Sequence, residues 1–151
     1  MLIPDNIIHE ALRDVIDILI DKYDDLDMRA SGKWADSLEI RTSGSTSEIW
    51  GESYTEQLTK GREPSNKMPP VQKIYKWMHD KRNFSGEKTL SRAYAIATNI
   101  KKFGTSWYQK GGSDLLEVLE REEVQNLFFE KIGEYVKVEI QKDLVRNLKG
   151  I

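Results

Sequence analysis

The sequence contains no cysteine, only two histidines and only four prolines. Without cysteine the chain can form no disulfide, no thiolate metal site and no cysteine nucleophile. No apolar run approaches the roughly 18 residues of a membrane-spanning helix, and the N-terminus lacks the basic start and apolar stretch of a signal peptide. We therefore expect a protein that works where it is made and is held together by its core.

The composition fits one globular domain. The 151 residues are 38% hydrophobic and 32% charged, which supplies enough apolar material for a core and argues against disorder. We expect residues 1–151 to form a single domain. Within it we expect an acidic helix over 1–27, a sheet-and-helix core over 28–110 and a helical segment over 111–151.

Charge is distributed unevenly along the chain, although the total is only −2. Residues 1–59 carry 13 acidic and 5 basic side chains, residues 60–110 carry 3 acidic and 12 basic, and residues 111–151 carry 9 acidic and 6 basic. The net charges are therefore −8, +9 and −3. One interpretation is that the segments fold against each other or lie on separate solvated faces. The other is that unlike surfaces dock onto a neighbouring subunit or nucleic acid, where opposite potentials steer association.

The N-terminal third predicts a helix followed by a hairpin. Apolar residues recur every three or four positions over 5–27, which is typical of an amphipathic helix. Apolar and polar residues alternate on either side of the turn-rich tract 42–46. This alternation predicts a β-hairpin around 37–51. Trp34 and Trp50 flank this hairpin, and both are expected in the core because tryptophan buries a large apolar area.

The remainder of the chain is mainly helical in pattern. We expect one or two helical turns over 54–59, a basic loop over 60–70, helices over about 71–83 and 89–103, and a long helix from about 114. Three of the four prolines lie in the 60–70 loop, and its last two suit the first turn of the helix that follows.

Two features of the later segments bear on flexibility and on the fold class. Gly111 and Gly112 suggest a flexible joint before the last helix. Residues 133–141 also alternate as a strand would, but we favour helix.

The expected fold is α+β, a small twisted antiparallel sheet packed by the N-terminal helix, two central helices and the long C-terminal helix.

No enzyme or metal motif is found. The sequence has no phosphate-binding loop, dinucleotide fingerprint, nucleophile elbow or His-Glu-x-x-His pair, and His9 and His79 lie on separate predicted helices. The aspartates at 21, 24, 25 and 27 continue a helix and lack the glycine of a calcium loop. A two-carboxylate acid–base pair has no spacing signature, so a hydrolase or nuclease with carboxylate-bound metal is the weakest alternative. We expect no catalytic residue, no metal and no cofactor.

The basic segment gives nucleic-acid binding a stronger physical basis. Its cations can contact phosphates, and the aromatic residues among them can stack on bases. The cations are Lys60, Arg62, Lys67, Lys73, Lys76, Lys81, Arg82, Lys88 and Arg92, interleaved with Tyr75, Trp77 and Tyr94. A nucleic-acid-binding accessory protein is therefore the alternative function.

A series of short motifs occurs in order between residues 28 and 108. They are Ser31-Gly32-Lys33, Ser37-Leu38, Trp50-Gly51 with Tyr54, Gly61-Arg62-x-Pro64, Pro69-Pro70, Ile74-x-x-Trp77, Ala95-Ile96-Ala97 with Ile100, and Phe103-Gly104-Thr105. This series resembles the tail-completion or head-to-tail connector (neck) proteins of tailed bacteriophages. The acidic N-terminal helix and the C-terminal helix match that family in type.

The resemblance implies a structural virion protein without enzymatic activity. Such a subunit assembles in the host cytoplasm into a homo-oligomeric ring that connects the portal to the tail. Its partners would be itself, portal and tail proteins, with packaged DNA as a non-specific neighbour and no membrane. A ring needs a heterologous interface, which unlike acidic and basic segments could supply.

The same resemblance suggests where copies meet. Gly61 and Gly104 would provide backbone positions, and the 60–70 loop would be an arm reaching a neighbour, since proline reduces the ordering cost on binding. The residues expected at subunit contacts are Tyr54, Arg62, Pro64, Lys67, Trp107 and Tyr108.

Overall fold

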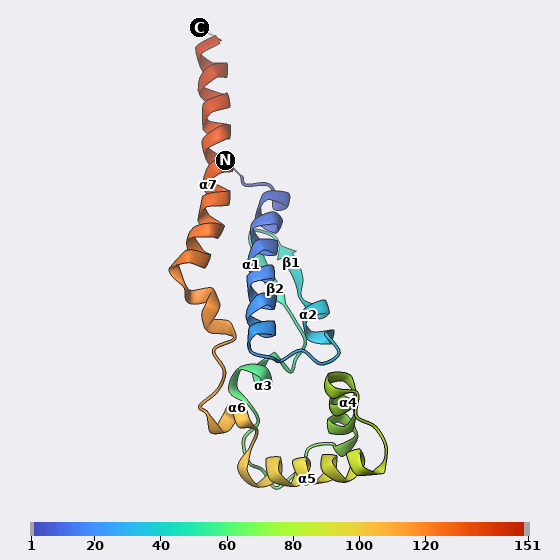
Figure 1. The fold of residues 1–151 in the computed structure, drawn as a ribbon. Coiled ribbons are helices and arrows are strands. Elements are labelled where there is room, and N and C mark those ends of the chain that lie inside the picture. The colour runs from blue at the N-terminus through green and yellow to red at the C-terminus, as the bar shows by residue number, and fades with distance from the viewer. Residues whose placement is uncertain (1, 150–151) are drawn as a thin grey trace. The chain divides into compact units, whose positions relative to one another are not determined.

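The computed structural model describes residues 2–149 (Figure 1), so Met1 and the last two residues of the expected C-terminal segment lie outside the described residues. The chain is 66% helical with a small two-stranded antiparallel sheet and a long C-terminal helix, which confirms the α+β fold class. The elements in order are α1 (Asp5–Asp25), α2 (Lys33–Ser37), β1 (Glu39–Ser43), β2 (Thr46–Trp50), α3 (Thr55–Lys60), α4 (Val71–Arg82), α5 (Glu87–Phe103), α6 (Ser106–Gln109), the 3-10 helix η1 (Leu116–Glu120) and α7 (Glu122–Lys149).

The chain divides into two compact units. Unit 1 comprises Met1–Asp21, Leu38–Trp50 and Leu116–Ile151, and unit 2 comprises Lys22–Ser37 and Gly51–Leu115. That residues 1–151 form one domain stays a prediction. Within residues 2–149, no helix combines the length and apolarity needed to cross a bilayer.

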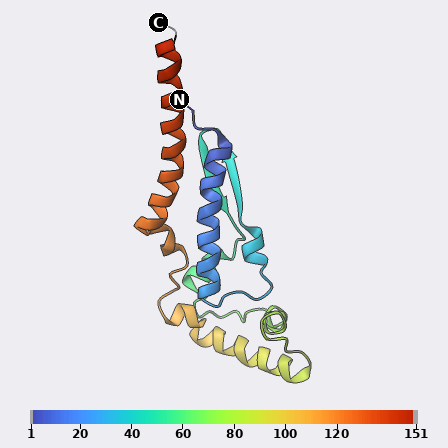
Figure 2. The same ribbon diagram turned by 45° about the horizontal axis from the view of Figure 1, so that its top comes forward.

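Unit 1 is built around the first part of α1, with the β1–β2 hairpin and α7 beside it (Figures 1 and 2). Ala11, Val15 and Leu19 are buried at intervals of four, the spacing of one helix face. Two polar contacts add to this packing. Lys131 on α7 donates to Asp14 at 2.7 Å, and His9 Nε2 lies 2.9 Å from the Thr42 hydroxyl of the hairpin.

The hairpin lies where the sequence predicts it, but Trp50 does not. Ile40 pairs with Ile49 across the sheet, and both are half-buried. Because successive strand residues point to opposite faces, Trp50 projects away from Ile49 and is 46% exposed. The prediction that Trp50 is a core residue is therefore wrong. Its ring lies 4.5 Å from the Arg41 guanidinium, and its indole nitrogen donates to Glu48 at 2.8 Å.

The C-terminal helix α7 is continuous for 28 residues. It runs through residues 133–141, so the helical interpretation is confirmed and the strand alternative is wrong. Val124 is its one buried side chain among the described residues. Phe128, Lys131, Ile132 and Tyr135 are half-buried.

Unit 2 is organised around Trp34, which is 1% exposed and confirms its expected place in the core. The Tyr23 ring packs on it with a centroid separation of 4.8 Å, and its indole nitrogen donates to the Thr55 hydroxyl at 2.8 Å. Trp34 lies on α2, a helix that the sequence did not predict. The Ser37 hydroxyl ends α2 by donating to the Trp34 carbonyl at 2.6 Å, and the strand begins two residues later, at Glu39.

The helices α4 and α5 pack against each other in the same unit. Met78 on α4 and the small residues Ala93 and Ala97 on α5 are buried. Asn83, at φ 56°, closes α4 in the left-handed conformation, and Gly104, at φ 80°, ends α5. The predicted helices over about 71–83 and 89–103 are therefore confirmed, the second beginning two residues early.

Candidate functional site

The basic loop over 61–70 is fastened to its own chain. The Arg62 amide donates to the Thr105 hydroxyl at 2.9 Å, and the Thr105 amide returns a hydrogen bond to the Arg62 carbonyl at 2.9 Å. The Ser65 amide donates to the Lys101 carbonyl at 3.1 Å. These bonds fix the loop along the end of α5 and the start of α6.

Two glycines allow this close approach. A Cβ on Gly61 would overlap the Tyr108 backbone nitrogen and lie 2.6 Å from the Thr105 hydroxyl. A Cβ on Gly104 would lie 2.6 Å from the Arg62 carbonyl oxygen and 2.7 Å from Tyr108 Cδ1. Both residues also have positive φ, at 77° and 80°, so the sequence expectation of backbone roles has a structural basis.

Three of the six predicted contact residues meet at this junction. Arg62, Pro64 and Tyr108 all lie within 4 Å of the position that a Gly104 Cβ would take. Trp107 is beside them in sequence and is half-buried, and Lys110 Nζ lies 5.4 Å from its ring centroid.

Of the other two predicted contact residues, Lys67 is bonded to this cluster through its backbone, and Tyr54 is not. Lys67 is exposed on the loop, where its carbonyl accepts from the Arg62 guanidinium at 3.4 Å. Tyr54 caps the start of α3, and within residues 2–149 no hydrogen bond joins its side chain to the other five. Their part in subunit contacts, like that of the junction residues, stays a prediction.

The glycine pair at 111–112 forms a hydrogen-bonded turn and not the expected flexible joint. The Gly112 amide donates to the Trp107 carbonyl at 2.7 Å. The next residue, Ser113, is buried and bonds twice to α3, through its amide to the Thr59 carbonyl and through its hydroxyl to the Leu58 carbonyl, each at 2.6 Å.

The arrangement of the acidic and histidine side chains bears on whether the chain could hold a metal ion. Over residues 2–149 no three His, Asp or Glu side chains are placed to hold a metal ion. Of the aspartates considered in the sequence, Asp24 pairs with Arg29 at 2.7 Å and Asp27 pairs with Lys81. These side chains therefore serve ion pairs within unit 2.

Among the residues that the structure describes, Tyr23, Tyr54, Arg29 and Lys131 have raised pKa values, each with a structural cause. Burial raises the pKa of the Tyr23 phenol and, likewise, that of Tyr54. A hydrogen bond to Asp24 raises the pKa of Arg29, and one to Asp14 raises the pKa of Lys131. Tyr23 packs on Trp34, and Arg29 and Lys131 each form an ion pair.

The C-terminal part of α7 carries an uncovered apolar surface. We define the α7 apolar face as Val138, Ile140, Leu144, Val145 and Leu148, whose exposed fractions run from 45% to 69%. Its charged neighbours pair within the helix, Lys142 with Glu139 at 3.1 Å and Arg146 with Asp143 at 3.5 Å. Intervals of four in the sequence identify Ile140, Leu144 and Leu148, but only packing shows that they stay uncovered.

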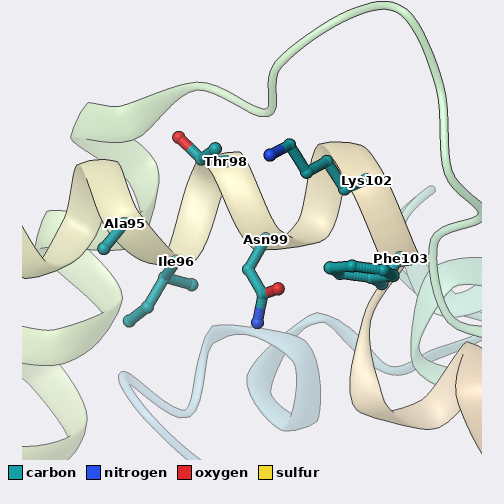
Figure 3. A pocket seen from close by; sticks show the side chains of 6 residues that line it. All are labelled: Ala95, Ile96, Thr98, Asn99, Lys102 and Phe103. Carbon is teal, nitrogen blue, oxygen red and sulfur yellow. The ribbon is translucent and has the colours of Figure 1, made fainter.

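A second surface lies on α5 and the loop beside it. We define the basic face as Lys67, Lys88, Arg92, Lys101 and Lys102, all exposed. An open groove of about 350 Å³ runs along the same helix, lined by Ala95, Ile96, Thr98, Asn99, Lys102 and Phe103 (Figure 3).

Comparison with protein-family models, with curated proteins and with solved structures finds no match to this chain.

Proposed function

We propose that this chain is a structural subunit of the bacteriophage neck, which assembles as a ring and connects the portal to the tail. The ordered motif series between residues 28 and 108 supports this proposal through its resemblance to neck proteins. The packing of Gly61 and Gly104 gives a physical reason for two of those motifs, because both allow the loop to approach α6 closely.

The observation that carries the proposal is the α7 apolar face. A helix of 28 residues is about 42 Å long, and five apolar side chains in its C-terminal part are at least 45% exposed. Several large apolar side chains exposed on one element favour a site of protein association. Contact between copies would bury this surface.

Charge also favours assembly through unlike surfaces. Glu10, Asp17 and Asp21 lie exposed on the outer side of α1, whereas the central segment has a net charge of +9. A closed ring requires one patch that fits a different patch. One chain therefore offers surfaces of opposite sign as well as an apolar one.

The oligomeric state tests the proposal. Native mass spectrometry and sedimentation of the purified chain, alone and with portal and tail proteins, should show a ring. The double variant Leu144→Lys with Leu148→Lys should reduce it to monomers, because charge on the α7 apolar face opposes burial. The matched control is Gln125→Lys with Asn147→Lys, which adds the same charge at exposed polar positions of α7 and should leave the ring intact. A chain that stays monomeric with both partners present contradicts the proposal.

A further inference from the structure

The stretch of chain around α5 is almost free of negative charge. Residues 81–113 hold seven basic side chains and a single acidic one, Glu87. Across residues 2–149, none of the five cations of the basic face lies within 4.0 Å of a carboxylate. Among the described residues, none of the five therefore forms an ion pair.

Three of these cations, Lys88, Arg92 and Lys102, lie in a line along one exposed side of α5, and Lys101 and the loop residue Lys67 lie at its C-terminal end. Positions 88, 92, 95, 99 and 102 follow each other at steps of four or three, which places them on one side of α5. From Lys88 to Lys102 the helix rises about 21 Å, close to the length of six phosphates along one DNA strand. Ala95 and Asn99 between them are small, so a backbone can come close to the helix.

The loop extends the line of charge at the C-terminal end of α5. The bond from the Ser65 amide to the Lys101 carbonyl holds the loop there, and the Lys67 amide donates to the Ser65 hydroxyl at 2.9 Å. Lys67 is thereby kept close to Lys101 and Lys102. Phe103 is 58% exposed at this end, in the groove with Asn99 and Lys102 (Figure 3).

From this arrangement we infer that the basic face binds the phosphate backbone of nucleic acid, with the exposed Phe103 ring available to stack on a base. Uncompensated cations gain affinity by releasing counterions from phosphates, and aromatic rings add stacking with little sequence preference. A protein partner fits less well, because lysine is depleted at protein interfaces and four of these five cations are lysines. This binding goes beyond the structural role in a ring.

Fluorescence anisotropy with a labelled DNA duplex of about 20 base pairs, and with the single strand of equal length, tests the inference between about 50 and 200 mM NaCl. The test variant combines Lys88→Gln, Lys101→Gln and Lys102→Gln. We expect it to bind both probes at least ~10-fold more weakly at the lower salt, and the slope of log affinity against log salt to shrink by about one per lysine removed.

The matched control combines Lys137→Gln, Lys142→Gln and Lys149→Gln. These exposed lysines lie on α7, so the net charge changes equally while the basic face is untouched. Binding by this control should equal that of the unchanged protein. Equal losses in the two triple variants would overturn the inference, since net charge alone would then explain binding. It would also be overturned if the α5 variant lost oligomeric mass but no DNA affinity, because the face would then join copies of the chain.

Discussion

Trp34 stabilises unit 2 through the volume of its buried ring and through the hydrogen bond of its indole nitrogen. Its indole nitrogen donates to the Thr55 hydroxyl, which itself donates to the Glu52 carbonyl at 2.6 Å. The variant Trp34→Phe removes the donor and part of the buried ring, so we expect unfolding to become easier by about 2 to 4 kcal/mol. Urea unfolding followed by circular dichroism measures this.

Trp50→Phe is the control for Trp34→Phe, because the same substitution then falls on a half-exposed hairpin residue. The Trp50 contacts to Arg41 and Glu48 are at the surface, and their loss should cost less than about 1 kcal/mol. Equal unfolding midpoints for the two variants would contradict the central place given to Trp34.

Because of Tyr23, we expect the free energy of unfolding to fall as the pH rises through the alkaline range. Burial raises its pKa, with Asp24 adding to the rise and Arg29 opposing it, so the folded chain keeps the phenol proton more tightly than the unfolded chain does. The resulting stabilisation is complete below the ordinary tyrosine pKa of about 10 and is lost as pH rises above it. Tyr54 shifts in the same direction through burial.

We therefore expect Tyr23→Phe to reduce the loss of stability between about pH 9 and pH 11, because no proton can then leave this site. Chemical denaturation at a series of pH values measures the effect. Tyr94→Phe, at an exposed position of α5, should keep the loss seen in the unchanged protein. If the Tyr23 and Tyr94 variants lost the same stability over this pH range, burial of Tyr23 would not be the cause of the pH dependence.

At the scale of elements, the junction of the loop with α5 and α6 depends on backbone proximity. Gly61→Ala adds both a strained φ and an overlap with the Tyr108 nitrogen, and we expect it to cost well over the ~1 to 2 kcal/mol of φ strain alone. Gly111→Ala isolates the strain, since Gly111 has φ 87° and nothing within 4 Å of its Cβ position. Thermal unfolding compares the two. A Gly61 variant no less stable than the Gly111 variant would contradict the close packing.

The elements that the sequence predicts well are those with a period and clear end signals. The proline pair at 69–70 precedes α4, Asn83 closes it, and Gly104 ends α5. The helix α2 has only five residues, too few to show a period. Its place depends on the burial of Trp34 and on Ser37, whose hydroxyl also accepts from the Glu52 amide at 3.1 Å, a contact between segments far apart in sequence.

The candidate surfaces were predictable only in part. The sequence identifies the cations at 60–110, but those that pair with a carboxylate, Lys60 with Glu56 and Lys81 with Asp27, cannot be separated from the others without the structure. The apolar residues of α7 repeat at intervals of four, yet the pattern does not tell which of them other segments cover. Packing between distant segments decides which side chains stay exposed, and the local spacing of residues cannot predict it.

At the scale of the whole molecule, the two proposed surfaces differ in their physics. The α7 apolar face has its neighbouring charges paired within the helix, so contact there gains free energy mainly from apolar burial. The basic face gains free energy from counterion release. One chain can therefore use an apolar surface to join copies and a charged surface to hold nucleic acid.

Salt should separate these two activities. Raising NaCl from about 50 to 200 mM should weaken nucleic-acid binding several hundredfold for about five phosphate contacts, whereas oligomers joined through the α7 apolar face should persist because salt does not weaken apolar burial. Sedimentation and anisotropy on the same samples measure both. If the oligomers dissociated over the same salt range in which nucleic-acid binding is lost, the copies would be joined by the acidic side of α1 and the basic face. The proposal that the α7 apolar face joins the copies would then be wrong.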